Sequence, residues 1–153
     1  MGLHHITWRA TASAVTHTSV VEALLSHLIG DTEAVRVEQT TSYHGAPMVL
    51  VTAHTKKKSE AMKSFAQLNV ATLNQLRNEA RLRIDEENSI HFRLDLDQAI
   101  GGKFNLATEE SNAVIKGQAK IEVYPGQDVL TECDTVLDHA ISIAIQRENG
   151  ETE

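Results

Sequence analysis

The sequence predicts an α+β fold, in which a mostly antiparallel sheet carries its helices on one face. The first supporting pattern is residues 90–97, where apolar and polar side chains alternate without interruption. Such alternation is typical of a strand with one face on a core and the other in water. Residues 113–124 alternate in the same way, whereas residues 19–30 place their apolar side chains on one face of a helix. Strand pairs with helices that return to one face of the sheet define this class.

These patterns and the turns between them give the element order β-α-β-β-α-(α)-β-β-α. We expect the elements at residues 4–12, 19–30, 34–43, 48–51, 59–84, 90–97, 113–124 and 128–147. A capping box, Ser19-x-x-Glu22, opens the first helix, and Gly30 ends it. The turn at 44–47 joins the two extended segments around it into a hairpin.

The second half of the chain has equally local signals. The helical region is expected to begin at Ser59, which can cap it, and to break near Asn69. The alternating strand is expected to reach Asp97, before Gly101-Gly102 supplies a flexible turn. Asp128 can cap the final helix, which is rich in apolar residues.

Length and composition predict one domain over residues 1–153, with a core at 3–124, a C-terminal helix at 128–147 and a polar tail at 148–153. At 153 residues and 41% hydrophobic content, the chain can bury a core without disulfides or metal. Its single cysteine, Cys133, fits a reducing compartment. There is no apolar segment long enough for a signal peptide or a membrane span. We therefore expect a cytoplasmic protein that does not enter membranes.

Positive charge is concentrated in the middle of an otherwise acidic chain. The net charge is −7, but residues 56–84 carry seven basic and two acidic side chains, a balance of +5. A phosphate could bind the lysines before a helix N-terminus together with the free N–H groups of its first turn. Arg77 and Arg81 are expected one helical turn apart, in a stripe that suits a phosphate backbone. The candidate RNA-binding residues of this segment are Lys56, Lys57, Lys58, Lys63, Arg77 and Arg81. The alternative is that these charges are simply solvated.

Several short motifs resemble those of a known family. They are HHITWRATASAVTH followed by VVEALLSHL, the turn YHGAP before MVLV, and FRLDLDQA with a later GG. Over residues 3–123 the chain resembles an archaeal family of predicted RNA-binding proteins, proposed to be exosome-associated and to share the fold of ribosomal protein L five. The resemblance implies RNA as a partner, within a complex of RNA processing or degradation. The strand at 90–97 departs from the family pattern by lacking a second basic residue, so Arg93 is its only candidate RNA contact.

Catalytic and metal signals are weak. Asp95 and Asp97, expected on one strand face, could hold Mg²⁺ and would make the protein a metal-dependent nuclease, but no general base accompanies them. His4 and His5 are expected to point to opposite faces of a strand, so they do not form a metal site. We therefore predict no enzyme activity, no catalytic residue, no metal and no cofactor.

The sequence thus favours a non-catalytic protein that contacts structured RNA mainly through the phosphate backbone. Aromatic residues, which would stack on unpaired bases, make up only 4% of the chain. The alternative function is a homo-oligomeric scaffold or accessory protein that binds other proteins. In either case the wide apolar arc of the last helix predicts a homodimer, unless that arc packs wholly on the domain's own core.

Overall fold

The computed structural model describes residues 2–13, 18–41 and 44–151. Its strands are β1 (Leu3–Ser13), β2 (Val35–Thr41), β3 (Pro47–Thr55), β4 (Ser89–Asp95) and β5 (Val114–Ile121). Its helices are α1 (Thr18–Ile29), the 3-10 helix η1 (Thr32–Ala34), α2 (Lys58–Phe65), α3 (Val70–Asn78), α4 (Ala80–Arg83), α5 (Leu96–Ile100) and α6 (Val129–Glu151). The five strands form one antiparallel sheet in the order β2-β3-β1-β5-β4.

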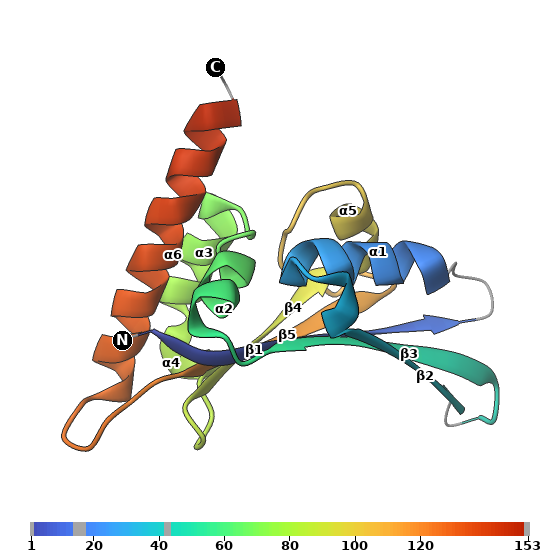
Figure 1. Ribbon diagram of the computed structural model, residues 1–153, viewed down its shortest axis with the longest axis horizontal. Coiled ribbons are helices and arrows are strands. Elements are labelled where there is room, and N and C mark those ends of the chain that lie inside the picture. The colour runs from blue at the N-terminus through green and yellow to red at the C-terminus, as the bar shows by residue number, and fades with distance from the viewer. Residues whose placement is uncertain (1, 14–17, 42–43, 152–153) are drawn as a thin grey trace.

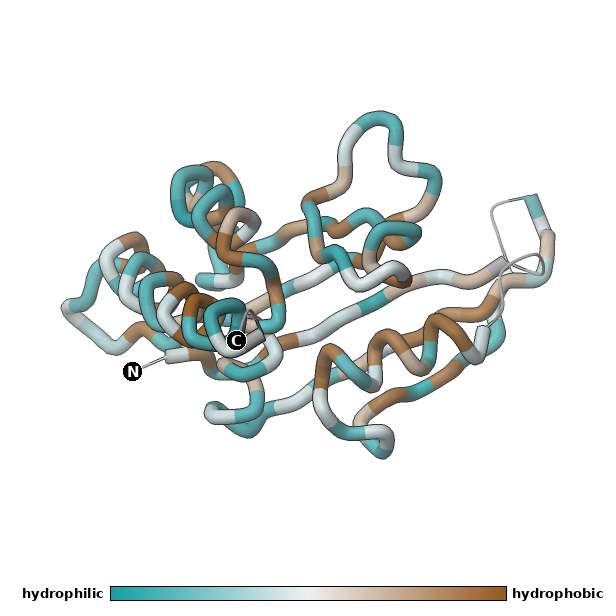
Figure 2. Tube along the Cα trace, turned by 90° about the horizontal axis from the view of Figure 1, so that it is seen from above, coloured by the Kyte–Doolittle hydropathy of each residue, from teal (hydrophilic) through white to brown (hydrophobic). Residues whose placement is uncertain are grey.

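The molecule has two layers, as the sequence predicts. The helices lie on one side of the sheet, with α1 and α5 above one end and α2, α3 and α6 above the other (Figure 1). Figure 2 looks down on the helical layer, with the strands passing beneath it. None of the described segments covers the opposite face of the sheet. The α+β class and the antiparallel sheet are therefore confirmed.

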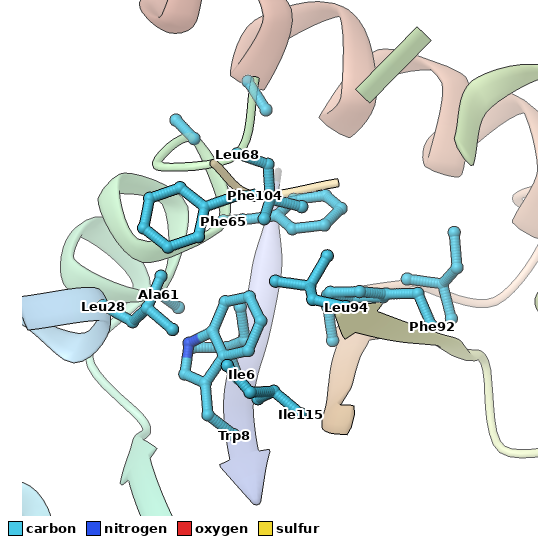
Figure 3. Close-up of a cluster of buried hydrophobic side chains, with 14 of the residues drawn as sticks. Ile6, Trp8, Leu28, Ala61, Phe65, Leu68, Phe92, Leu94, Phe104 and Ile115 are labelled. Atoms are coloured by element: carbon cyan, nitrogen blue, oxygen red, sulfur yellow. The ribbon is translucent and has the colours of Figure 1, made fainter. Parts of the chain in front are cut away.

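Aromatic side chains fill the centre of the core between the two layers. Gly117 of β5 pairs with Trp8 on one side and Phe92 on the other. Because glycine has no side chain, the two rings meet across it at a centroid distance of 5.4 Å and an interplanar angle of 81°. Phe65 of α2 approaches the Phe92 ring at 5.7 Å (Figure 3). This cluster joins the helical layer to the middle of the sheet.

A buried hydroxyl links three elements beside this cluster. The indole Nε1–H of Trp8 donates to Ser64 Oγ at 2.7 Å, and that hydroxyl donates to the carbonyl oxygen of Leu28 at 2.5 Å. Burying an indole N–H without a partner is costly, so this relay stabilises one arrangement of β1, α2 and α1.

The C-terminal part of α6 fixes the junction between α2 and α3. The guanidinium of Arg147 donates to the carbonyl oxygens of Ala66 and Leu68. The adjacent Glu148 accepts from the backbone N–H of Val70, the first residue of α3, at 3.2 Å. The helix thus extends to Glu151, and the prediction of a polar tail from residue 148 is wrong for residues 148–151. No helix in the described ranges is long and apolar enough to cross a membrane.

Most element predictions are confirmed; the errors are the two short helices η1 and α5, which were not predicted, and several element ends. The break near Asn69 and the cap at Asp128, whose carboxylate accepts from the N–H of Thr131 at 3.1 Å, are as predicted. Ser19 and Ser59 lie inside helices that begin one residue earlier, so neither opens its helix. Gly30 follows α1 with φ +80°, a conformation that favours glycine and confirms its role in ending the helix.

Candidate nucleic-acid interface

The uncovered face of the sheet, which we call the bare face, carries mainly polar and basic side chains. Alternation along each strand buries one set of residues, such as Ile6 and Trp8, and directs the next set away from the helices. Five cationic side chains of the described strands point to the bare face: Arg9, Arg36, Arg93, Lys116 and Lys120. Only two carboxylates accompany them, Glu38 on β2 and Asp95 on β4, and both strands are edge strands.

Four of these cations form a single row across the sheet, the cation row Arg36, Arg9, Lys116 and Arg93. Strand register places Arg36 opposite Thr52, Thr52 opposite Arg9, Arg9 opposite Lys116 and Lys116 opposite Arg93. With strands roughly 4.8 Å apart, the row extends about 19 Å from β2 to β4. All four side chains are exposed, and none forms an ion pair with another described residue. Unpaired cations in a row of this length can contact a phosphate backbone.

A row of neutral polar groups and histidines lies beside the cation row, in the order His54, Thr7, Gln118 and His91. Thr7 Oγ1 and His54 Nδ1 are 2.7 Å apart. His91 Nε2 lies 2.6 Å from a carboxylate oxygen of Asp85, and this hydrogen bond lowers the pKa of Asp85 below its ordinary value. These groups can donate hydrogen bonds next to the cations.

A histidine cluster stands at the end of the bare face nearest the N-terminus. The rings of His5 and His54 are 5.2 Å apart, and the pKa of each is lowered mainly by burial. Repulsion adds to this effect, from His54 and Lys120 on His5 and from Lys56 on His54. A bound phosphate would reverse that repulsion, because it favours the charged imidazolium.

The prediction that His4 and His5 point apart is wrong. A register shift between Leu3 and His5 interrupts the pairing of β1 with β5. Such a shift re-aims side chains at the end of a strand. The Nδ1 atoms of His4 and His5 come within 2.9 Å, with the rings edge to face. Even so, no group of three His, Cys, Asp or Glu side chains in the described ranges is placed to hold a metal ion.

A hollow of about 830 Å³ adjoins the end of the cation row at β4. Arg83, His91, Arg93 and Lys116 line it together with Ala107, Thr108, Glu109 and Ser111 of the loop after α5. A second hollow, of about 850 Å³, lies in the helical layer between α1, α5 and α6. Its lining includes the exposed apolar side chains of Val20 and Ile100, so it does not suit phosphate.

The model of a family described as RNA-binding matches residues 5–121, which is most of the chain. The protein belongs to this RNA-binding family. Among curated proteins, none matches the chain significantly in sequence.

Several solved archaeal structures have the same fold. A DUF54 protein of Archaeoglobus fulgidus is 20% identical, with a TM-score of 0.68 over 92% of this chain and 99% of its own. A DUF54 protein of Methanothermobacter thermautotrophicus is 20% identical, with a TM-score of 0.61 over 94% and 96%. A UPF0201 protein of Methanococcus jannaschii is 11% identical, with a TM-score of 0.57 over 87% and 92%. These likenesses establish the fold.

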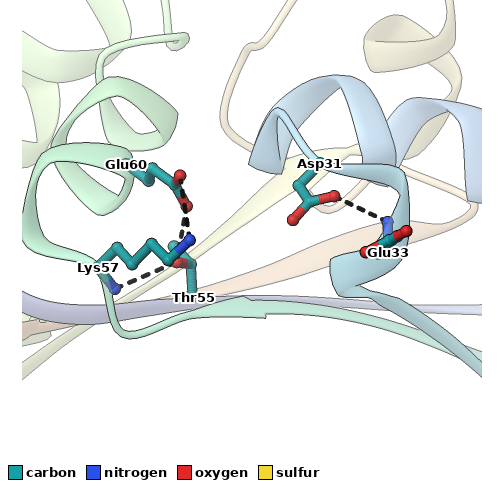
Figure 4. A network of polar contacts seen from close by, with 5 residues as sticks. All are labelled: Asp31, Glu33, Thr55, Lys57 and Glu60. Carbon is teal, nitrogen blue, oxygen red and sulfur yellow. Dashed lines mark hydrogen bonds and ion pairs between the residues drawn. The ribbon is translucent and has the colours of Figure 1, made fainter.

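The RNA-binding residues predicted from segment 56–84 lie outside the cation row of this RNA-binding family member. Lys57 lies 3.8 Å from Glu60, which also accepts from the Thr55 hydroxyl (Figure 4), and Lys58 pairs with Glu122. Arg77 donates to Asp138 at 2.7 Å, which raises the pKa of Arg77. The remaining RNA-binding candidates of the segment, Lys56, Lys63 and Arg81, are exposed.

The prediction that Arg77 and Arg81 lie one turn apart on the same helix is also wrong. Arg77 lies in the last turn of α3, whereas Arg81 lies on α4, because the chain leaves the first helix at Glu79. The two side chains therefore do not form a stripe along one helix. Arg93 is the predicted residue that does lie in the cation row. Arg9, Arg36 and Lys116 were missed as RNA contacts, although alternation along their strands indicates that they face outward.

The proposed Mg²⁺ pair also needs correction. Asp95 ends β4 and Asp97 lies on α5, so the two carboxylates do not share a strand face. The Asp95 carboxylate accepts from the N–H of Gln98 at 3.0 Å and from the Ser111 hydroxyl at 2.7 Å. These bonds lower its pKa and fix it as the cap of α5. The structural basis for the nuclease alternative is therefore lost.

Proposed function

We propose that this protein binds RNA on the bare face of its sheet, with the cation row against the phosphate backbone. Membership of the RNA-binding family supports RNA as the ligand. The row itself is the observation that carries the location, because four exposed cations without ion-pair partners among the described residues lie in register across the sheet. Phosphate contacts supply most of the sequence-independent affinity for nucleic acids.

The chemistry of the bare face favours contacts with phosphate over stacking on bases. Sheets that bind single-stranded RNA present aromatic rings to the bases. Here the aromatic residues of the described strands, Trp8 and Phe92, are both buried in the core. The bare face instead offers cations, imidazoles, hydroxyls and amides. Structured RNA, with its regularly placed phosphates, is the class of ligand that fits.

The acidic net charge is compatible with this proposal. At physiological ionic strength, exposed charges more than about 8 Å apart are largely screened from one another. The local balance of five cations to two edge carboxylates on the bare face therefore matters more than the net charge of −7.

The test compares two variants with the same change in net charge. In the first, Arg9, Arg36, Arg93 and Lys116 are all changed to Gln; in the matched control, Lys57, Lys63, Arg77 and Arg81 are changed instead. Binding of an RNA hairpin is measured over a range of salt concentrations. The slope of log affinity against log salt should fall in magnitude by about 3 in the first variant, or about 0.7–0.9 per lost phosphate contact. The control should stay close to wild type.

Two outcomes would overturn the proposal. A wild-type protein that binds no RNA at low salt would exclude the function. Loss of binding in the control but not in the sheet variant would move the site to segment 56–84, as the linear distribution of charge predicts.

We infer a binding role without catalysis, because the candidate catalytic carboxylate Asp95 caps a helix instead. The association with RNA processing or degradation, the fold of ribosomal protein L five and the cytoplasmic location stay predictions. Co-purification with identified RNA and protein partners tests the first of them. The single-domain organisation over residues 1–153 is likewise a prediction, supported by one hydrophobic cluster that includes residues of both the sheet and α6.

A further inference from the structure

The hollow beside β4, which we call the edge pocket, is an open depression at the end of the cation row. It encloses about 830 Å³, within the size range of small-molecule sites, roughly 300–1,000 Å³. Its polar lining comes from β4 and β5 of the sheet, from the end of α4 and from the loop after α5. The charged and hydroxyl side chains in it are Arg83, His91, Arg93, Glu109, Lys116, Thr108 and Ser111.

Hydrogen bonds hold the loop side of the edge pocket in place. Leu106 forms a β-bridge with Leu94, and the N–H of Ala107 donates to the Arg93 carbonyl at 2.8 Å. This pairing occupies the outer edge of β4. The following turn is closed by the Ser111 hydroxyl, which accepts from the N–H of Thr108 at 3.0 Å and donates to Asp95. The loop is thus a fixed wall outside the last strand of the sheet.

Positive charge predominates inside the edge pocket. Arg93 and Lys116 have no ion-pair partner among the described residues. Arg83 forms an ion pair with Glu79 at 2.8 Å and donates to the backbone carbonyl of His91, which orients it at the β4 edge. Two unpaired cations, Arg93 and Lys116, and the paired Arg83 therefore stand with one carboxylate, Glu109, in the lining. The Thr108 hydroxyl, which accepts from the N–H of Glu110 at 3.2 Å, can still donate a hydrogen bond into the pocket.

The edge pocket continues into the cation row. A smaller hollow of about 200 Å³, which includes Arg9 and Thr7, shares His91 and Lys116 with it. An RNA strand whose phosphates follow the row from Arg36 to Arg93 therefore arrives in the edge pocket and meets the wall behind it. The loop outside β4 therefore favours an RNA strand that ends in the edge pocket over one that extends past it.

We propose that the edge pocket binds the terminal phosphate of an RNA strand whose backbone lies along the cation row. A phosphate monoester at a strand end carries a charge of about −1.5 to −2 at pH 7, compared with −1 for an internal diester. A pocket with two unpaired cations, a third cation at its edge and a fixed wall favours the more highly charged, terminal group. The inference rests on the proposed RNA binding and adds to it a preference for the chemistry of the strand end.

The test uses one RNA sequence with three kinds of end: a 5′-phosphate, a 3′-phosphate, or hydroxyls at both ends. Wild-type protein should bind one of the phosphorylated forms roughly tenfold more tightly than the hydroxyl form, a difference of one charge-assisted contact. The phosphorylated form that is preferred identifies the polarity of the bound strand. Arg93→Gln and Lys116→Gln should each reduce the ratio of affinities for the phosphorylated and hydroxyl forms towards 1.

Arg36→Gln is the matched control, because it removes a cation from the far end of the same row. It should weaken binding of all three RNAs by the same factor and leave the preference intact. Equal binding of the three RNAs by a wild-type protein that binds them well would overturn the pocket proposal and leave RNA binding standing. A preference that survives both Arg93→Gln and Lys116→Gln would place the terminal phosphate elsewhere. Absence of binding to any of the three would instead overturn the proposed function.

Discussion

Replacing Gly117 by alanine should destabilise the protein, although most glycine-to-alanine changes in ordinary backbone conformations are neutral or stabilising. A Cβ atom at this position would lie 2.4 Å from both Cε2 and Cζ of the Phe92 ring. Ordinary contact begins at 3.4 Å, so the ring would have to retreat by about 1 Å. Phe92 is 2% exposed and is packed between Trp8 and Phe65, so it has little room to do so.

The size of the effect follows from three contributions. Inserting a methyl group into a packed core costs about 1–3 kcal/mol. Disturbing the edge-to-face pair of Trp8 and Phe92 costs up to about 1.5 kcal/mol more. The smaller conformational entropy of the unfolded alanine chain offsets about 0.4–1 kcal/mol. We therefore expect Gly117→Ala to lower the free energy of unfolding by about 1–3 kcal/mol.

Equilibrium unfolding in urea, followed by the fluorescence of Trp8, measures this change, because Trp8 is the single tryptophan of the chain. Gly150→Ala is the control, since a Cβ atom there meets nothing within 4 Å, and it should leave stability unchanged or slightly higher. Removing the ring with Phe92→Leu should reduce the additional cost of Gly117→Ala. A Gly117→Ala protein as stable as wild type would show that the ring yields freely and would refute the reasoning.

Ser64→Ala leaves the Trp8 N–H without its buried acceptor and should lower the free energy of unfolding by about 1–3 kcal/mol. Urea titration measures this change. A loss below about 0.5 kcal/mol, which is typical of surface substitutions, would contradict the prediction. The pKa values of His5 and His54 are below the ordinary 6.5, mainly because of burial, so the unfolded chain binds protons more readily. The stabilising contribution of the neutral histidines should therefore be complete above pH 6.5, and the free energy of unfolding should decrease as the pH drops through that value. His54→Gln should make this decrease smaller. An unchanged dependence of stability on pH would exclude His54 as the cause. Self-association through α6 should depend on Ile145, which is 43% exposed. In sedimentation experiments, Ile145→Glu should therefore shift a dimer towards monomer. A wild-type protein that is monomeric at every concentration would exclude the dimer hypothesis.

The last helix shows how far a local pattern determines packing. Its sequence correctly predicts an apolar arc, and the structure buries the central part of that arc on the protein's own core: Cys133, Val136, Leu137, Ala140 and Ala144. Burial also raises the pKa of the Cys133 thiol to about 11. The sequence alone could not divide the arc between the core and a partner, because that division depends on the width of the surface on which the helix packs.

The element ends depended on tertiary contacts as well. Alternation continues to Asp97 in the sequence, but β4 stops at Asp95 because the Asp95 carboxylate accepts from Gln98 and Ser111. Ser111 belongs to a loop 16 residues further along the chain. The bond to Gln98 is a local helix cap, but the bond to Ser111 has no signature in the local sequence, and the two together outweigh the small difference in propensity between strand and helix.

The sequence by itself determined the class of the fold, the order of the strands and longer helices, and the outward direction of most charged strand residues, because alternation and helical periodicity are local properties of the chain. Only the tertiary structure decided which charges are free to bind a ligand. The basic segment 56–84 stands out in the sequence, yet Lys57, Lys58 and Arg77 form ion pairs in space. The cation row instead draws single residues from four strands, and it exists because the order β2-β3-β1-β5-β4 and the strand register bring them into line. Strand order and register are set by pairing between distant segments, whose energy depends on the whole sheet and not on any one segment.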